Sequence, residues 1–171
     1  RTLPTETEKP VTTHPLAVIL AEYPTLTVYG FENPDETDPA EMQERSEELR
    51  KSEAAFDAAC AWIREHLPLT PRSRGYYSSY YLKHVAEVEI GYLANGLFIA
   101  AMIHCGHRFR QPGRGNPNAY FPLHKRKVTT LDKRRVVGLY RRAERHRRER
   151  AASSEPRTAG KSVLTAANSQ P

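Results

Sequence analysis

The chain has 171 residues, of which 39% are hydrophobic and 27% charged, with 13 prolines and 9 glycines. This length fits one domain with loose ends rather than two full domains. Its net charge of +6 and isoelectric point near 9.4 favour an anionic partner. Since no apolar run approaches the roughly 20 residues that cross a bilayer, and residues 1–10 lack a signal-peptide core, we expect a soluble, cytoplasmic protein with no membrane partner.

The charge is divided unevenly along the chain. Residues 32–65 hold eleven acidic and four basic residues, whereas residues 124–150 hold twelve basic and three acidic ones. The acidic segment therefore either folds back on the basic one or points away and leaves the basic end free to meet phosphates.

The first half of the chain predicts a loose arm and a long acidic helix. Residues 1–15 lack periodicity and read as a disordered arm. Residues 16–31 hold two apolar runs split by Pro24, which predict a short helix or strand followed by a strand. Asp38 followed by Pro39 and Glu41 is typical of a helix start, and we expect one acidic helix over residues 39–67.

The middle of the chain predicts a helical pair over residues 79–105, after a basic, aromatic connector at 68–77. Ser78 or Ser79 can cap the first helix, and Gly91 can end it. Residues 97–103 are apolar on every face, which is typical of a buried helix rather than a DNA-reading one.

The last third predicts a short strand pair and a basic helix. Extended segments are expected at 107–110 and 119–123, on either side of a glycine-containing loop. Thr129 or Thr130 can cap a helix running to Arg150, and residues 151–171 read as a disordered tail. We therefore expect a single α+β or mostly α domain over residues 16–150.

A resemblance to a group of proteins is carried by the central segment. The residues concerned are 79–84, Glu87, 92–101 and 118–121. This pattern resembles uncharacterised small proteins encoded by bacterial phages and plasmids, over residues 62–123. The resemblance implies a mobile-element origin and a bacterial cytoplasm, and it implies no activity.

Basic residues supply the main functional hypothesis, because clustered arginines grip phosphates and release counterions. The alternative is a solvated helix neutralised by the acidic helix or by a partner protein. The candidate nucleic-acid contacts are Arg72, Arg74, Tyr80, Lys83, Arg108, Arg110, Arg114, Lys125, Arg126, Lys127, Lys133, Arg134, Arg135, Arg141, Arg142 and Arg145.

The tyrosines at positions 76, 77, 80 and 81 accompany Arg72 and Arg74. Bases stack on such rings, but alternate tyrosines also pack into a core while their hydroxyls reach the surface. Both interpretations stay open.

A histidine group is the candidate metal or catalytic site. His84 and Glu87 share one helical face, and His104 and His107 follow downstream. Their spacing matches no metal signature, so surface and helix-end histidines are the favoured interpretation and we expect no cofactor.

The leading hypothesis is a non-enzymatic nucleic-acid-binding protein of a mobile element, with DNA favoured over RNA. The second is a protein–protein interaction module that docks on a host factor. A metal-dependent hydrolase or nuclease at the histidine group is the third. The apolar stripe of the basic helix (Val136, Val137, Tyr140 and Ala143) could also form a homodimer.

Overall fold

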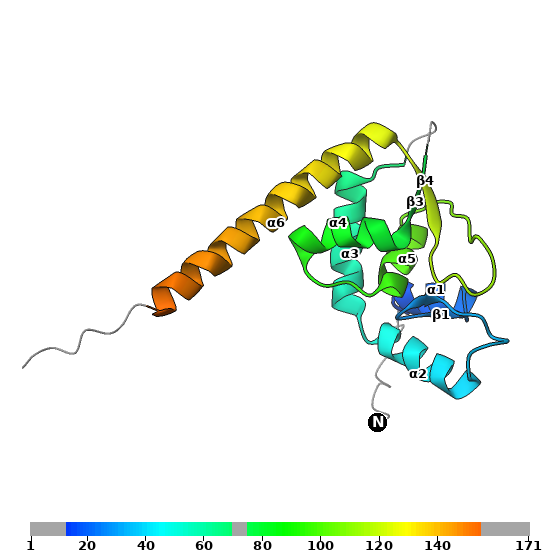
Figure 1. The fold of residues 1–171 in the computed structure, drawn as a ribbon. Coiled ribbons are helices and arrows are strands. Elements are labelled where there is room, and N and C mark those ends of the chain that lie inside the picture. Colours follow the sequence, from blue (N-terminus) through cyan, green and yellow to red (C-terminus); the bar gives the residue numbers. More distant parts are fainter. Residues whose placement is uncertain (1–12, 70–74, 155–171) are drawn as a thin grey trace, which may run out of the picture.

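The structure, a computed structural model, describes residues 13–69 and 75–154 (Figure 1). Within them six helices accompany two antiparallel strand pairs, which confirms the α+β or mostly α fold class. The elements are α1 (Pro15–Glu22), β1 (Leu26–Thr27), β2 (Gly30–Phe31), α2 (Pro39–Arg50), α3 (Glu53–His66), β3 (Gly75–Ser78), α4 (Ser79–Ile90), α5 (Asn95–His104), β4 (Tyr120–Leu123) and α6 (Lys125–Ser154).

The expected acidic helix over 39–67 is two helices. The carboxylate of Asp38 accepts from the amide of Ala40 at 2.8 Å and caps α2 as expected. The helix ends at Arg50, and α3 starts afresh at Glu53. The physical reason lies in burial: Leu49 is the buried residue of α2, whereas α3 buries a full face. If α2 and α3 formed one straight helix, the mostly polar α2 would extend past the core that α3 covers. The chain therefore bends at the point where the apolar face of α3 begins.

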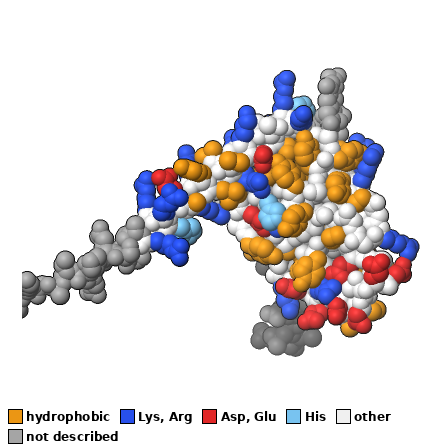
Figure 2. All heavy atoms as spheres, viewed as in Figure 1, with side chains coloured by type: hydrophobic (Ala, Val, Ile, Leu, Met, Phe, Trp, Pro, Cys, Tyr) orange, Lys and Arg blue, Asp and Glu red, His pale blue; other side chains and the backbone are white. Residues whose placement is uncertain are grey.

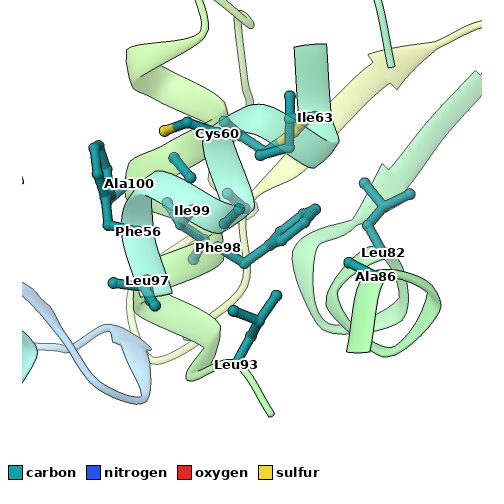
Figure 3. Packing of buried hydrophobic residues seen from close by; sticks show 14 of the residues in the cluster. Phe56, Cys60, Ile63, Leu82, Ala86, Leu93, Leu97, Phe98, Ile99 and Ala100 are labelled. Atoms are coloured by element: carbon teal, nitrogen blue, oxygen red, sulfur yellow. The ribbon is translucent and has the colours of Figure 1, made fainter. Parts of the chain in front are cut away.

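Helix α5 is the centre of the core, as its sequence predicts. Residues 95–102 are all buried, and α5 packs against α1, α3 and α4. Figure 3 shows Leu97, Phe98 and Ile99 among side chains of α3 and α4. The preceding helix also follows prediction: Ser78 caps α4, and Gly91 ends it with φ +87°.

Within the described residues, no single helix is both long and apolar enough to span a membrane; α4 and α5 meet that criterion only as a pair bent by 92°.

The larger strand pair differs from the expected one. β4 pairs with β3, in the register Gly75↔Leu123 to Ser78↔Tyr120. The expected partner segment, 107–110, contributes one bridge between Arg110 and Tyr120. β3 overlaps residues 68–77, which the sequence predicts to be a connector without strand structure. It is held by the start of α4, where the amide of Ser79 donates to the carbonyl of Ala119 at 2.7 Å.

The basic helix begins earlier and ends later than predicted. α6 starts at Lys125, and Thr130 is no cap, because its hydroxyl donates to the carbonyl of Arg126 inside the helix at 2.9 Å. At its far end α6 reaches Ser154, into the predicted tail, while α1 starts at Pro15, inside the predicted arm. The remainder of both predicted segments, 1–12 and 155–171, lies outside the described residues.

Helix α6 has a docked half and a free half. Its 30 residues correspond to a rod about 45 Å long. Val128 and Leu131 are buried at its start, whereas residues 143–150 are all exposed. In Figure 1 the helix crosses the body near α4 and then projects beyond it.

Candidate nucleic-acid interface

Opposite charges lie on different parts of the molecule. In Figure 2 acidic side chains gather at the end of the body that holds α2, and Lys and Arg side chains follow α6. Two acids of α6 pair within that helix: Asp132 with Arg135 and Glu144 with Arg148. Of the acidic segment 32–65, helix α2 thus lies away from α6, whereas Glu65 at the end of α3 lies beside it.

Two adjoining clefts run along α6 and are called here the basic cleft. One, of about 590 Å³, lies between α6 and the end of α3; the other, of about 560 Å³, lies between α6 and the end of α4. They share Thr130 and Arg134. The charged and histidine side chains lining them are Glu65, His66, Glu89, His124, Arg126, Lys127, Lys133, Arg134 and Arg141.

The cleft is strongly positive because its carboxylates are outnumbered and partly engaged. Five Lys and Arg side chains line it against Glu65 and Glu89. The carboxylate of Glu89 accepts from the indole of Trp62 at 3.0 Å and lies 3.2 Å from the ring of His66. Lys127, Arg134 and Arg141 recur every seven residues, so α6 presents them on one face. This geometry suits a row of phosphates rather than a single ion.

Two other predicted arginines hold α6 on the body. The guanidinium of Arg142 donates to the backbone carbonyl of Val88 at 2.8 Å. That of Arg135 lies 3.4 Å from the carboxylate of Asp132 and 6.0 Å from the centre of the Tyr81 ring. Burial and a hydrogen bond with Asp132 raise the pKa of Tyr81. On α6, the predicted set therefore includes arginines that line the cleft, such as Arg134 and Arg141, and arginines that face α4, Arg135 and Arg142.

Lys83, predicted as a nucleic-acid contact, lies inside the fold rather than on the surface of α4. The residue is only 5% exposed, and its ammonium lies 3.0 Å from the carboxylate of Glu87. The rings of Tyr80 and Tyr92 flank it at 5.1 and 5.7 Å. Burial and pairing engage this charge within the fold. Tyr80, another predicted contact, is exposed.

The remaining predicted contacts are dispersed. Arg108 and Arg110 line a separate cleft of about 260 Å³, where Arg110 stacks 4.3 Å from the centre of the Tyr76 ring. Arg114 pairs with Asp35 on the open surface. Lys125 and Arg145 are exposed on α6, and Arg72 and Arg74 lie outside the described residues. Arg108, Arg110 and Arg114 thus do not line the basic cleft.

The histidine group is not brought together as one centre. His84 lies 2.6 Å from Glu87 through its Nδ1 atom, but the ring of His104 contacts that of Phe56 at a tilt of 50° and His107 is buried. Burial raises the pKa of Glu87, and hydrogen bonds from the amide of Leu93, from Lys83 and from His84 outweigh it, so the net shift is downward. Among residues 13–69 and 75–154, no group of three or more His, Cys, Asp or Glu side chains could hold a metal.

The residues that line the basic cleft on the side opposite α6 were not predicted from the sequence. Glu65, His66 and Glu89 come from the ends of α3 and α4, and nothing in their spacing links them to the α6 residues that follow 41 to 69 positions later. His124, next to a basic run at 125–127, is the one lining residue with a local signal. No protein-family model, curated protein or solved structure matches the chain, so the geometry of this cleft carries the functional inference.

Proposed function

We propose that the chain is a non-enzymatic nucleic-acid-binding protein that grips a phosphate backbone along α6. The observation that carries this proposal is the basic cleft, where five Lys and Arg side chains converge against two carboxylates. Arginines suit bidentate phosphate contacts, and each neutralised phosphate releases counterions.

Duplex DNA is the polymer that α6 fits best. An α-helix fills the major groove of B-form DNA, which is about 12 Å wide, whereas the major groove of A-form RNA is too narrow for side chains to read. The free half of α6, exposed on all sides over residues 143–150, has the clearance to enter such a groove. The cleft then holds the adjoining backbone.

The test is fluorescence anisotropy with labelled duplex DNA, duplex RNA and single strands over a salt series. The variant is the triple Lys127→Gln, Arg134→Gln, Arg141→Gln. Its matched control is Arg50→Gln, Lys51→Gln, Arg64→Gln, which removes the same charge from exposed positions on α2, α3 and their junction. We expect the wild-type affinity for DNA to fall steeply with salt, and the cleft triple to reduce the slope of log K against log salt by about 2 to 3. The control should keep the wild-type slope.

Equal slopes for the two triples would contradict the cleft as the binding surface, because they would show a response to net charge alone. Absence of binding at low salt would contradict nucleic-acid binding altogether.

The second candidate function is a protein–protein interaction module that docks on a host factor. It is favoured by the exposed apolar side chains of α6: Val136 is 56% exposed and Tyr140 73% exposed. Flanked by arginines, this stripe matches an acidic partner with an apolar groove, and it also suits a homodimer. Sedimentation of the chain alone tests the dimer. Titration of the Tyr140→Ser variant with DNA separates the two functions, since nucleic-acid binding through the cleft should survive it.

For the setting we propose a bacterial mobile element. The support is the residue pattern over 62–123 that resembles phage- and plasmid-encoded proteins. Integrase, replication or conjugation genes beside the coding sequence would support this setting, and a position among housekeeping genes would count against it.

A further inference from the structure

The two cysteines of the chain lie against each other although 45 positions separate them. Cys60 is in the middle of α3, and Cys105 follows the last residue of α5. The thiol of Cys105 lies 3.7 Å from the backbone carbonyl of Cys60, to which it donates. Figure 3 shows Cys60 among packed side chains such as Phe56 and Ile63. The contact therefore belongs to the α3–α5 interface of the core.

The two thiols differ in access. Cys60 is 2% exposed, whereas Cys105 is half-buried and lines a cleft of about 250 Å³. Arg64, Leu67, Leu69 and His107 also line that cleft. A small solute can reach Cys105 through this opening, whereas Cys60 is closed to solvent.

The surroundings favour an ionised Cys105. In its thiolate form Cys105 accepts a hydrogen bond from the Cys60 thiol; this bond and the Arg64 guanidinium lower the pKa of Cys105, against the effect of burial, to about 7. The same hydrogen bond, burial and the carboxylate of Asp57 raise the pKa of Cys60, with Arg64 opposing them. His107, the other titratable group of the cleft, has its pKa lowered by burial. Cys105 is thus the attacking thiolate, and Cys60 remains a thiol near neutral pH.

We propose that Cys105 is a site of oxidation by hydrogen peroxide and that Cys60 resolves it, forming a disulfide between α3 and α5. This thiol pair is independent of the basic cleft, and the inference does not depend on nucleic-acid binding.

The chemistry balances with peroxide as the only oxidant. The Cys105 thiolate attacks one peroxide oxygen, the O–O bond breaks, and the leaving hydroxide takes up the proton given by the thiol to form water. Cys105 then carries a sulfenic acid. The sulfur of Cys60 attacks the sulfur of Cys105, and the released hydroxide takes the Cys60 proton as a second water. Each sulfur loses one electron, and one peroxide is reduced.

The test follows the mass of the full, folded chain during exposure to hydrogen peroxide. We expect a loss of two hydrogens that a dithiol reductant reverses, and a peptide that joins Cys60 to Cys105 after digestion without reductant. The Cys60→Ser variant should stop at the sulfenic acid of Cys105, which dimedone traps. The Cys105→Ser variant should keep its mass. Alkylation of wild-type Cys105 by iodoacetamide should have its midpoint near pH 7, which needs no variant to fold.

Three results would overturn the proposal. One is a wild-type mass that stays unchanged at a hydrogen peroxide concentration sufficient to oxidise free glutathione in a parallel sample. Another is a Cys105→Ser variant that reacts at the wild-type rate. The third is a wild-type chain that accumulates the dimedone adduct at Cys105 with Cys60 left as a thiol. Circular dichroism of each variant separates these results from misfolding, and the wild-type peptide map is decisive where a variant does not fold.

Discussion

Gly138 of α6 lies directly over Val88 of α4: a Cβ atom built on the glycine would be 2.5 Å from Cγ1 of Val88. The helices approach this closely where α6 passes the end of α4, beside the second half of the basic cleft. The carbonyl of the same valine accepts the hydrogen bond from Arg142. This crossing therefore sets the position of α6 and the width of the cleft.

The Gly138→Ala variant should loosen the crossing. Alanine gains up to about 1 kcal/mol in helix propensity, but overpacking against a stiff, β-branched neighbour costs about 1–3 kcal/mol. We expect a net loss of about 1 kcal/mol in the free energy of unfolding, measured by urea denaturation. In the Val88→Ala background the overlap is gone, so the same change should stabilise. Stabilisation by Gly138→Ala in both backgrounds would show that the close approach has no energetic effect.

Two arginine pairs on α6 should separate stability from binding. Arg135→Met with Arg142→Met removes groups that contact α4 or its neighbours, and we expect a loss of about 1–2 kcal/mol in stability. Arg134→Met with Arg141→Met makes the same change in charge at the cleft. Its stability should stay within about 0.5 kcal/mol of wild type, while its salt slope for DNA falls by about 2. Thermal melts and anisotropy on both pairs check this, and identical phenotypes would contradict the division of roles.

The sequence correctly predicted those features that depend only on residues close together in the chain. The Asp38 cap, the α4 end at Gly91 and the burial of α5 all follow from residues within one or two turns. The break between α2 and α3 was missed because Leu49 and Phe56 keep helical spacing across it, and only the core decides where the chain bends. β3 was missed because its pairing with β4 joins segments 45 residues apart.

The candidate site was predicted in part for the same reason. The basic run of α6 is local and visible in the sequence, whereas its docking face depends on tertiary contacts of Arg135 and Arg142. The pairing of Lys83 with Glu87, one turn away, is visible in the spacing, but the ring of Tyr92, beyond the helix end, contacts Lys83 only in the fold. A contact between Cys60 and Cys105 has no spacing signature at all.

Stability should depend on pH through His107. Burial lowers its pKa below the ordinary 6.5, against a hydrogen bond with the Leu67 backbone. The unfolded chain therefore binds a proton below pH 6.5 that the folded chain does not, so the free energy of unfolding falls as the pH drops from 6.5 toward the lowered pKa. This contribution amounts to at most about 1.4 kcal/mol per pH unit.

Urea denaturation of wild type and His107→Gln across this pH range isolates the effect from the other histidines. The variant is expected to start less stable, because it changes a buried side chain, but to lose less stability as the pH falls. Parallel curves for the two proteins would show that His107 does not titrate differently on folding.

Gly96 at the start of α5 should tolerate no side chain. A Cβ atom there would be 1.7 Å from the backbone carbonyl oxygen of Thr27, and the amide of Gly96 donates to the carbonyl of Val28 at 3.2 Å. Backbone on both sides leaves no flexible group to give way, so Gly96→Ala should cost about 3 kcal/mol or more, in the range of severe core defects. Ala100→Gly, four residues on in α5, is a control for helix propensity and should cost about 1–2 kcal/mol. A Gly96→Ala variant as stable as wild type would contradict the packing of α5 on the β1–β2 turn.

The free half of α6 should contribute to binding through its continuity as a helix. Arg142 is hydrogen-bonded to Val88 of α4, and Ala143→Pro kinks the part of α6 beyond this contact without changing the charge. Ala151→Pro places the same residue near the helix end and is the matched control. We expect both variants to melt within a few degrees of wild type, because the core lies elsewhere. Ala143→Pro should weaken binding to duplex DNA and spare binding to single strands, which bend to follow displaced arginines. Since the kink leaves every positive charge in place, a duplex affinity equal to wild type would mean that α6 acts through its charge alone and does not enter a groove as a rod.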